Sequence, residues 1–316
     1  MQNFLNFPID LVNPITGKDI FQEDIGTYSS FNNILDLYVS DGNFITDTQS
    51  NFYNEVKFPN YDDLDTFATL LDKSRKSIFP KKLDDEIPYG ASVLEAGCGT
   101  GQLSISLSRY NRNITGIDLS KGSLIEAKKF IDINKIRTVN LFRMNIFHMF
   151  FKDNTFDVII SNGVLHHTNN AKLAFTKLCE KLNKNGIIIV GLYHTYGRIM
   201  QKFRQFIIKI FGDKLKIIDS RFSENISNNK KNAWFLDQYK NPFETTHTLS
   251  EIKNWFNENN IEYLSSIPFD FELDKKIFEK KSLKNKNFYH LYELFLTFNR
   301  NQINEGGFFV IIGKKK

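Results

Sequence analysis

The stretch that decides the fold is VLEAGCGTGQL, residues 93–103. Val93 and Leu94 end a short apolar run, which predicts a buried strand. Residues 102–108 can begin a helix, and the turn between the two elements carries three glycines: Gly97, Gly99 and Gly101. A glycine turn at a helix N-terminus presents backbone N–H donors and a favourable dipole. We therefore expect a pocket here for an anionic or carboxylate-bearing nucleotide cofactor.

The spacing of these glycines separates the turn from a dinucleotide-binding turn. Dinucleotide folds space their glycines as GxGxxG, whereas this chain has GxGxG, with Glu95 two residues before the first glycine. This spacing is wrong for a pyrophosphate and argues against a dehydrogenase. Taken alone, the turn also fits a plain strand-to-helix connection, in which Cys98 is a small packing residue.

Composition and charge are those of an ordinary globular protein. Of the 316 residues, 41% are hydrophobic and 24% are charged, and the net charge is +5. This charge gives no strong nucleic-acid signal. Two cysteines provide neither a disulfide framework nor a metal quartet, so we expect no metal site. We also expect no signal peptide, no membrane span of about 18 apolar residues, and a cytoplasmic location.

Residues 1–90 form a leader to the core. Proline and glycine breaks predict short strands and turns over residues 4–24. The apolar spacing predicts a short helix over 31–38 and an amphipathic helix over 64–79. Prolines at either end of residues 80–88 predict a linker into the core.

Two interpretations of this leader remain open. It covers the cofactor and helps to form the substrate cleft, or it packs on the edge of the sheet. Tyr53 and Tyr61 are its most informative side chains, because a phenol can both stack and donate a hydrogen bond.

Residues 91–196 alternate strand-like and helix-like runs, which is typical of a parallel α/β sheet. Asp118 follows the second strand, and Asn145 follows the third. The carboxyl ends of neighbouring parallel strands meet at the ligand crevice. Asp118 can therefore accept from the hydroxyls of a ribose, although a helix cap before Ser120 is an alternative. Asn145 can meet an adenine amino group.

The fourth strand, residues 156–161, is followed by a segment that it delivers into the same crevice. This segment includes Asn162, Val164, His166 and His167. We interpret the histidines as substrate contacts or a base, with simple loop packing as the alternative. A helix over 171–182 and a fifth strand that ends at Tyr193 follow.

Together these motifs resemble the class I S-adenosylmethionine-dependent methyltransferases. The matching segments are EAGCGTG at 95–101, GIDLS at 116–120, Asn145, FDVIISNGVLHH at 156–167 and LNKNGIIIVGLY at 182–193. The resemblance implies a Rossmann-like, doubly wound, seven-stranded sheet with an antiparallel last strand. It also implies S-adenosyl-L-methionine as the cofactor.

The resemblance assigns cofactor contacts to individual residues. It implies that Glu95 and the turn from Gly97 through Cys98 and Gly99 to Gly101 hold the methionine portion. The remaining contacts it implies are Asp118 for the ribose, Leu119 for the adenine face, Met144, Asn145 and Ile146 for the border of the base, and Asn162 and Val164 for the region near the methyl group. The family often has Asp where this chain has Asn145, so the charge at the adenine edge differs here.

Residues 197–247 are expected to form a cap inserted after the fifth strand. Residues 198–211 predict an amphipathic basic helix, whose charges are Arg198, Lys202, Arg204 and Lys209. Membrane or nucleic-acid contact through this helix stays open beside a solvated face. Residues 234–247 interleave aromatic and hydrogen-bonding side chains without a period, so we expect a loop that forms a pocket wall.

Residues 248–316 are expected to complete the sheet. A capping pattern predicts a helix over 248–259, and a strand follows at 261–267. We expect a further helix over 291–298 and a final strand over 307–313. The chain also looks like a bacterial methyltransferase group with GLYHTYGR-like and DQYKNPFETTHT-like segments.

The predicted activity is methyl transfer to an oxygen or nitrogen nucleophile of a small-molecule acceptor. The protein then has to align the nucleophile with the methyl group and remove its proton. We expect His166, His247 or Tyr193 to be catalytic, with His166 or His247 as the base, because imidazole titrates near neutral pH. The alternatives are a methyltransferase acting on RNA or protein, and a non-catalytic S-adenosylmethionine-binding protein.

Overall fold

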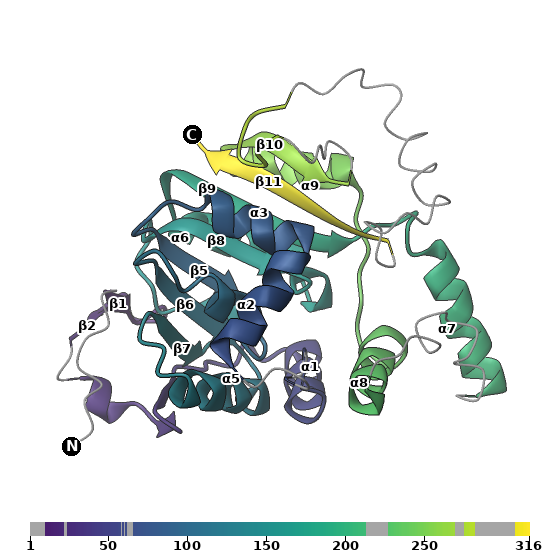
Figure 1. The fold of residues 1–316 in the computed structure, drawn as a ribbon, viewed down its shortest axis with the longest axis horizontal. Coiled ribbons are helices and arrows are strands. Elements are labelled where there is room, and N and C mark those ends of the chain that lie inside the picture. The colour runs from purple at the N-terminus through teal and green to yellow at the C-terminus, as the bar shows by residue number, and fades with distance from the viewer. Residues whose placement is uncertain are drawn as a thin grey trace.

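A computed structural model of the chain describes residues 10–21, 24–57, 59, 61, 66–212, 227–268, 275–281 and 307–316. Within these residues, nine strands form one mixed sheet in the order β10-β11-β9-β8-β5-β6-β7-β4-β3 (Figure 1). The strands are β3 (Ser30–Phe31), β4 (Ile34–Asp36), β5 (Ser92–Ala96), β6 (Asn113–Asp118), β7 (Val139–Arg143), β8 (Phe156–Asn162), β9 (Leu182–Tyr193), β10 (Ile261–Ile267) and β11 (Phe308–Lys315). A separate antiparallel pair, β1 (Leu11–Val12) and β2 (Asp19–Ile20), lies in the leader.

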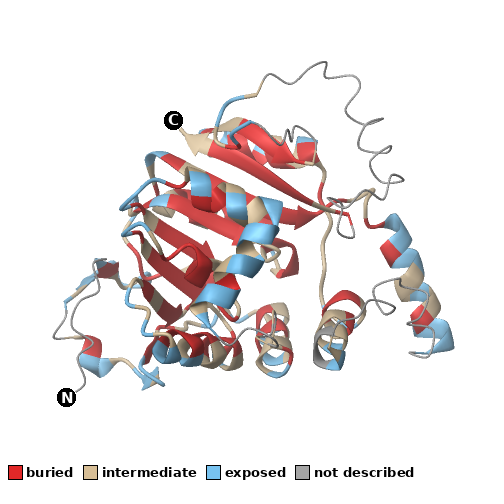
Figure 2. Ribbon diagram, in the orientation of Figure 1, coloured by how far each residue is buried: buried red, intermediate tan, exposed pale blue. Residues whose placement is uncertain are grey.

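Helices cover both faces of the sheet. Side chains alternate between the faces along each strand, so Val93 packs in the layer with Leu83 and Leu124, whereas Leu94 packs in the layer with Phe175. The first layer contains α2 (Phe67–Lys76), α3 (Ile78–Glu86), α4 (Gln102–Ser106) and α5 (Lys121–Ile133), and the second contains α6 (Ala171–Lys181) and α9 (Leu249–Glu258). The central strands are almost wholly buried (Figure 2), as their isoleucine-rich composition requires.

The strand directions confirm the predicted doubly wound α/β sheet with an antiparallel last strand, although β3 and β4 raise the number of described strands from the expected seven to nine. Strands β7, β6, β5, β8 and β9 run parallel, and β11 pairs antiparallel with β9. Strand β10 closes this edge by pairing antiparallel with β11. The helix predicted over residues 291–298 lies outside the described residues.

The leader extends the sheet at the opposite edge, where the sequence prediction was wrong. Residues 31–38 were expected to be helical, but β3 and β4 form a hairpin there, and β4 pairs parallel with β7. Asn32 and Asn33 have φ angles of 47° and 59°. Positive φ at two successive central residues is typical of a tight hairpin turn, and asparagine tolerates it well.

Two further segments predicted to be irregular are helical. The expected linker over residues 80–88 largely belongs to α3, because Pro80 lies in the first turn of that helix, where its missing N–H costs nothing. The expected loop over residues 234–247 begins within α8 (Asn228–Tyr239). Phe235, Asp237 and Gln238 are all buried, so the inward face mixes apolar and polar side chains and has no amphipathic period.

The basic helix of the cap is α7 (Ile199–Phe211). Its exposed side chains include several large apolar ones: Ile199, Met200, Phe203, Phe206, Ile210 and Phe211. The exposed surface of α7 is therefore more apolar than the solvated charged face that the sequence left open as one interpretation. In the part of the chain that the structure describes, no helix has the length and apolar character of a membrane span.

Candidate active site

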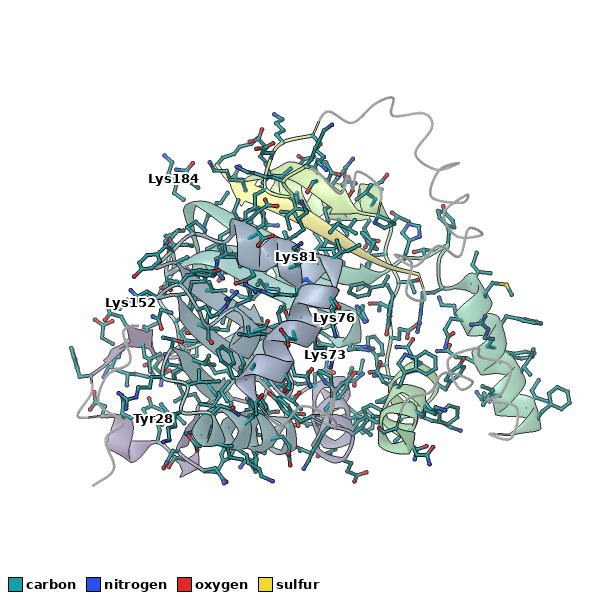
Figure 3. All side chains as sticks on the ribbon, in the orientation of Figure 1. Tyr28, Lys73, Lys76, Lys81, Lys152 and Lys184 are labelled. Carbon is teal, nitrogen blue, oxygen red and sulfur yellow. The ribbon has the colours of Figure 1, made fainter. Side chains whose placement is uncertain are left out.

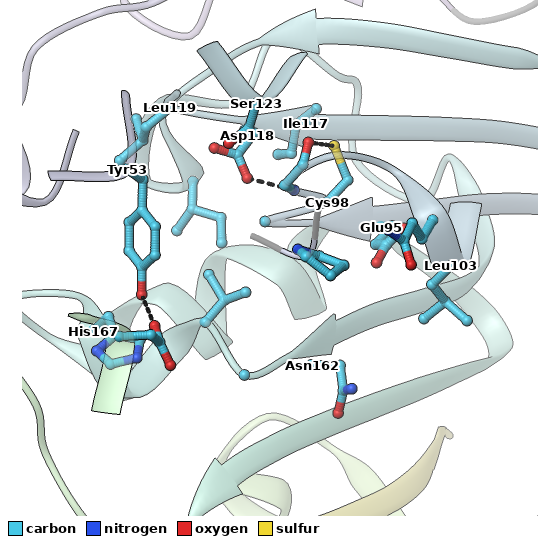
Figure 4. A pocket seen from close by; sticks show the side chains of 18 of the residues that line it. Tyr53, Glu95, Cys98, Leu103, Ile117, Asp118, Leu119, Ser123, Asn162 and His167 are labelled. Carbon is cyan, nitrogen blue, oxygen red and sulfur yellow. Dashed lines mark hydrogen bonds between the residues drawn. The ribbon is translucent and has the colours of Figure 1, made fainter. Parts of the chain in front are cut away.

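A cavity of about 510 Å³ lies at the carboxyl ends of the parallel strands (Figure 4). Its wall contains most of the residues predicted for the cofactor, together with one predicted catalytic residue: Glu95, Gly97, Cys98, Gly99, Asp118, Leu119, Met144, Asn145, Ile146, Asn162, Val164 and Tyr193. Three predicted residues, Gly101, His166 and His247, are not among those that line it. Side chains that are far apart in sequence therefore surround one common space.

The glycine turn packs so closely against Val164 that Gly97 leaves no room for a side chain. Gly97 has a φ angle of 80°, and a Cβ atom there would lie 2.3 Å from Val164 Cγ2. Gly101 has a φ angle of 75° and is the N-cap of α4, where it shapes the turn from behind the wall. The turn thus exposes its backbone to the cavity.

Glu95 braces the turn against the helix that follows it. One carboxylate oxygen, Oε2, accepts from the Ser104 backbone N–H at 2.8 Å and also from the Ser104 hydroxyl. Burial raises the pKa of Glu95 to about 7, and the hydrogen bonds from Ser104 oppose this rise. Glu95 therefore exchanges a proton near neutral pH inside the cavity wall.

Asp118 links the ends of β5 and β6. Its Oδ2 accepts from the Gly99 N–H at 2.7 Å, and its Oδ1 accepts from the Ser120 N–H at 2.8 Å. Burial raises the pKa of Asp118 above its ordinary value, while these backbone hydrogen bonds lower it. Each oxygen keeps a second lone pair, so the carboxylate can still accept from a ligand.

The residues after β7 form the next part of the wall. Asn145 Oδ1 accepts from the Phe147 N–H at 3.1 Å, and its Nδ2 donates to the Val39 carbonyl at 3.3 Å. The amide is therefore held in one orientation with one lone pair of Oδ1 unused. Met144 and Ile146 flank it as buried apolar side chains.

Asn162 has an unsatisfied acceptor at the end of β8. Its Oδ1 is buried, and no described residue donates a hydrogen bond to it. A Cβ atom on Gly191 would lie 2.1 Å from this oxygen, so the glycine makes space for the amide. An unpaired buried acceptor is costly, and a ligand N–H in the cavity would satisfy it.

The opposite wall comes from the leader and the cap. Helix α1 (Phe44–Glu55) supplies Gln49 and Tyr53, and α8 supplies Trp234, Asp237 and Gln238. The Tyr53 hydroxyl donates to Asp237 Oδ1 at 2.8 Å (Figure 4), and Gln49 Nε2 donates to Asn241 Oδ1 at 2.8 Å. Helix α2 adds Lys73 (Figure 3), which donates to Gln102 Oε1 at 3.1 Å. The leader therefore both extends the sheet and lines the cavity.

A buried arginine supports this wall from behind. Arg198, assigned from the sequence to the charged residues of the basic helix, is fully buried. Its guanidinium pairs with Glu244 at 2.5 Å and donates to Gln238 Oε1 at 2.6 Å. The guanidinium carbon lies 3.8 Å from the centre of the Tyr193 ring, and Gln238 Nε2 donates to the Tyr193 hydroxyl at 2.6 Å. The sequence pattern does not reveal this burial, because the hydrogen-bond partners Gln238 and Glu244 lie 40 and 46 residues from Arg198.

Of the three histidines considered for the site from the sequence, one lines the cavity and two lie outside its wall. His167 lines the cavity, and its Nδ1 lies 2.9 Å from the Phe243 carbonyl. A carbonyl only accepts, so Nδ1 carries the proton and Nε2 of the neutral ring is an acceptor. His166 is fully buried behind Tyr193, and burial lowers its pKa well below 6.5. His247 is held by Thr245 and Glu251, at 2.9 Å and 3.0 Å.

The part of the chain that matches known proteins includes the residues on the cofactor side of this cavity. A family model described as a methyltransferase domain matches residues 94–190, which include the glycine turn, Asp118, Asn145 and Asn162. The domain at residues 94–190 belongs to the class I S-adenosylmethionine-dependent methyltransferase superfamily. S-adenosyl-L-methionine is the methyl donor of this superfamily.

Individual curated relatives resemble this chain over part of their length. The ubiquinone biosynthesis O-methyltransferase of Azorhizobium caulinodans is 29% identical over 114 residues, which cover 36% of this chain and 44% of that protein. The demethylmenaquinone methyltransferase of Bacillus cereus is 23% identical over 189 residues, which cover 59% of this chain and 76% of that protein. The chain spans 50%, 44% and 35% of three curated relatives that it matches.

The methyltransferase fold is shared with a solved structure. PKMT2 from Rickettsia typhi superposes with a TM-score of 0.54 at 20% identity, over 77% of this chain and 54% of that protein. At this identity the likeness concerns the fold alone.

The residues present fit the cofactor on their own chemistry. A Cβ atom at Gly97 would collide with Val164, so the turn keeps a glycine there and lines the cavity through Gly97 and Gly99. Asp118 offers carboxylate lone pairs, and Asn162 Oδ1 lacks a donor among the described residues. An adenosyl compound with an amino acid moiety has hydroxyl and amino groups to donate to these two positions.

Proposed function

We propose that this protein transfers a methyl group from S-adenosyl-L-methionine to an oxygen or nitrogen nucleophile of a small-molecule acceptor. The observation that carries the proposal is the two-sided cavity. One side consists of the strand ends matched by the methyltransferase domain, and the other side consists of α1, α8 and Tyr193. A cofactor and a small acceptor can thus share one space.

On the cofactor side, the position of each predicted residue in the wall supports its assignment to one part of the cofactor. Glu95 and the turn at Gly97–Gly99 hold the methionine portion, and the Asn162 amide oxygen accepts from its amino group. The Asp118 carboxylate accepts from the ribose hydroxyls. Other wall residues border the adenine: Leu119, Met144, Asn145 and Ile146.

On the acceptor side, the protein aligns and encloses the nucleophile. When bound, the cofactor supplies an electrophilic methyl group on a sulfonium centre, so little covalent chemistry is required of the protein. We assign His167 Nε2 as the acceptor of a proton from the nucleophile, because His167 lines the cavity, whereas His166 and His247 do not. Burial raises the pKa of Tyr193, so its phenol stays neutral and donates or accepts as a positioning group.

The names of two relatives support a small-molecule acceptor. They refer to ubiquinone biosynthesis and to demethylmenaquinone, and neither name refers to a nucleic acid or a protein substrate. The size of the cavity is consistent with a small acceptor, because residues of α1, α8 and the core enclose only about 510 Å³.

A fractionated methyl-transfer assay tests the proposal. Labelled S-adenosyl-L-methionine is incubated with the protein and with small-molecule, RNA and protein fractions of a cell extract. We expect label to enter the small-molecule fraction and S-adenosylhomocysteine to accumulate in proportion. Label in RNA or protein would assign the alternative acceptor, and cofactor binding without any transfer would indicate a non-catalytic protein.

A further inference from the structure

A buried carboxylate without a cationic partner lies in the acceptor wall. Asp237 of α8 is 6% exposed and lines the cavity. Its Oδ1 accepts from the Tyr53 hydroxyl at 2.8 Å, and its Oδ2 accepts from Gln238 Nε2 at 2.8 Å. In the part of the chain covered by the structure, no Lys, Arg or His side chain forms an ion pair with it.

The charge of Asp237 is not neutralised by its neighbours. Arg198 lies in the same network, but its charge is matched by Glu244 at 2.5 Å. Tyr53 and Gln238 are neutral donors, and burial together with Asp237 raises the pKa of Tyr53 well above 10. A buried charge without a counter-charge is strongly unfavourable. Asp237 therefore presents a negative charge that no cation of the described residues pairs with, and this charge borders the cavity.

Aromatic side chains line the same cavity as this charge. Tyr53, Tyr193 and Trp234 line the cavity beside Asp237, and His167 lies with its ring centre 6.2 Å from that of Tyr53. Aromatic faces attract cations through their quadrupole. A carboxylate within aromatic walls is a chemical environment suited to an ammonium group, and it disfavours an anionic ligand.

We propose that the methyl acceptor is an amine, held as its ammonium ion by Asp237 between the rings of Tyr53 and Tyr193. This inference rests on the proposed methyl transfer and narrows its acceptor from any oxygen or nitrogen nucleophile to an amine. A neutral hydroxyl would leave the Asp237 charge uncompensated, and a carboxylate acceptor would add a second negative charge.

The groups in the wall account for the proton and the methyl group. The ammonium nitrogen first gives one proton to His167 Nε2, which frees its lone pair. The amine nitrogen then forms a bond to the methyl carbon as the carbon–sulfur bond breaks, and the electron pair of that bond stays on sulfur. The positive charge moves from sulfur to nitrogen, where the Asp237 carboxylate stabilises it. Solvent removes the proton from His167.

A matched set of probes tests the charge preference directly. Benzylamine, benzyl alcohol and benzoate share one ring and differ in charge. Their affinities are measured by ligand-observed NMR titration on the protein saturated with S-adenosylhomocysteine. We expect benzylamine to bind about tenfold or more tightly than benzyl alcohol, and benzoate to bind most weakly, since a charge-assisted contact is worth at least one factor of ten.

Two variants assign the preference to Asp237. Asp237→Asn keeps the size of the side chain and removes its charge, so the advantage of benzylamine over benzyl alcohol should disappear. Tyr53→Phe keeps the ring and the Asp237 charge, so the advantage should remain. Asp85→Asn, an exposed residue of α3, is the control for a lost surface charge and should behave as the wild type.

The outcomes separate this inference from the proposed function. Equal affinity for the amine and the alcohol, tighter binding of benzoate, or an unchanged preference in Asp237→Asn would overturn the amine assignment while cofactor binding persists. Failure of the wild-type protein to bind S-adenosylhomocysteine would instead count against the proposed function. If Asp237→Asn loses its folded circular dichroism spectrum, the comparison between probes on the wild type and Tyr53→Phe decides the question.

Discussion

Asp118 is the residue at which the cofactor assignment can be tested by a single change. Its carboxylate is oriented by the N–H groups of Gly99 and Ser120. If it also accepts from a ribose, Asp118→Ala removes charge-assisted hydrogen bonds worth about 1.5–3 kcal/mol each. We predict that the affinity for S-adenosylhomocysteine falls about tenfold to a hundredfold, as measured by isothermal titration calorimetry.

Asp85→Ala provides the control for this measurement, because Asp85 is exposed on α3 away from the cavity. Its affinity should equal that of the wild type. Unchanged binding in Asp118→Ala would remove Asp118 from the cofactor site.

Glu95 gives the stability of the protein a defined pH dependence. Burial raises its pKa in the folded state to about 7 from an ordinary value of 4.5. The folded state therefore holds the proton more tightly than the unfolded chain. The stability that protonated Glu95 contributes is fully present below pH 4.5 and is lost as the pH rises through about 7. The free energy of unfolding falls over this range by at most about 1.4 kcal/mol per pH unit.

Glu95→Gln keeps the shape of the side chain and cannot titrate. The wild type loses stability as the pH rises, whereas the variant lacks this loss. We therefore predict that the free energy of unfolding of Glu95→Gln minus that of the wild type is larger at pH 8 than at pH 5. Chemical denaturation across this range measures the difference. A constant difference between the two proteins would show that Glu95 titrates normally in the folded state.

At the residue scale, the sequence predicted the side chains that follow strands and missed those held by distant partners. Asp118 and Asn145 follow strand ends in the chain, so their meeting follows from the parallel sheet. Arg198 and Asp237 depend on contacts with Glu244 and Tyr53, far away in sequence. Local periodicity carries no information about such pairs, and a buried arginine therefore resembled a solvated one.

At the scale of elements, the glycine turn between β5 and α4 allows a matched pair of substitutions. Gly97 and Gly90 both have positive φ angles, 80° and 72°. A Cβ atom on Gly97 would lie 2.3 Å from Val164, whereas one on Gly90 would have no neighbour within 4 Å. Alanine at Gly90 therefore adds backbone strain of about 1–2 kcal/mol, and alanine at Gly97 adds a steric clash to similar strain.

We predict that Gly97→Ala lowers the free energy of unfolding by more than Gly90→Ala and also abolishes detectable binding of S-adenosylhomocysteine. Gly90→Ala should retain wild-type binding. Urea denaturation and calorimetry measure the two effects. Equal destabilisation with binding intact in both variants would contradict the close approach of Gly97 to Val164.

Elements with a clear period were predictable, and elements that depend on unusual backbone or mixed burial were not. The predicted helices α6 and α9 begin at side-chain caps, Asn170 and Thr248. The β3–β4 hairpin depends on positive φ at Asn32 and Asn33, which the apolar pattern does not record.

At the scale of the whole molecule, the leader and the cap are joined across the cavity. Gln49 Nε2 donates to Asn241 Oδ1 at 2.8 Å and to the Phe243 carbonyl at 2.9 Å. These bonds connect parts of the chain about 190 residues apart, so they depend on the complete fold. Gln49 is therefore the side chain through which the coupling of the two parts can be tested.

We predict that Gln49→Ala lowers the free energy of unfolding by about 1–3 kcal/mol, since each buried hydrogen bond contributes about 1 kcal/mol. Amide hydrogen exchange should accelerate in both α1 and α8. Asn51→Ala, an exposed position on the same helix, is the control and should change neither quantity. Faster exchange confined to α1 would contradict the coupling between leader and cap.

The central claim is that the strand ends around Gly99, Asp118 and Asn145 enclose an S-adenosyl compound. Isothermal titration calorimetry of the full chain with S-adenosylhomocysteine, S-adenosyl-L-methionine and NAD⁺ tests this claim most directly. We predict one-to-one binding of both S-adenosyl compounds, competition between them, and no heat with NAD⁺. No binding of either S-adenosyl compound at millimolar concentration, or tight binding of NAD⁺, would contradict the claim.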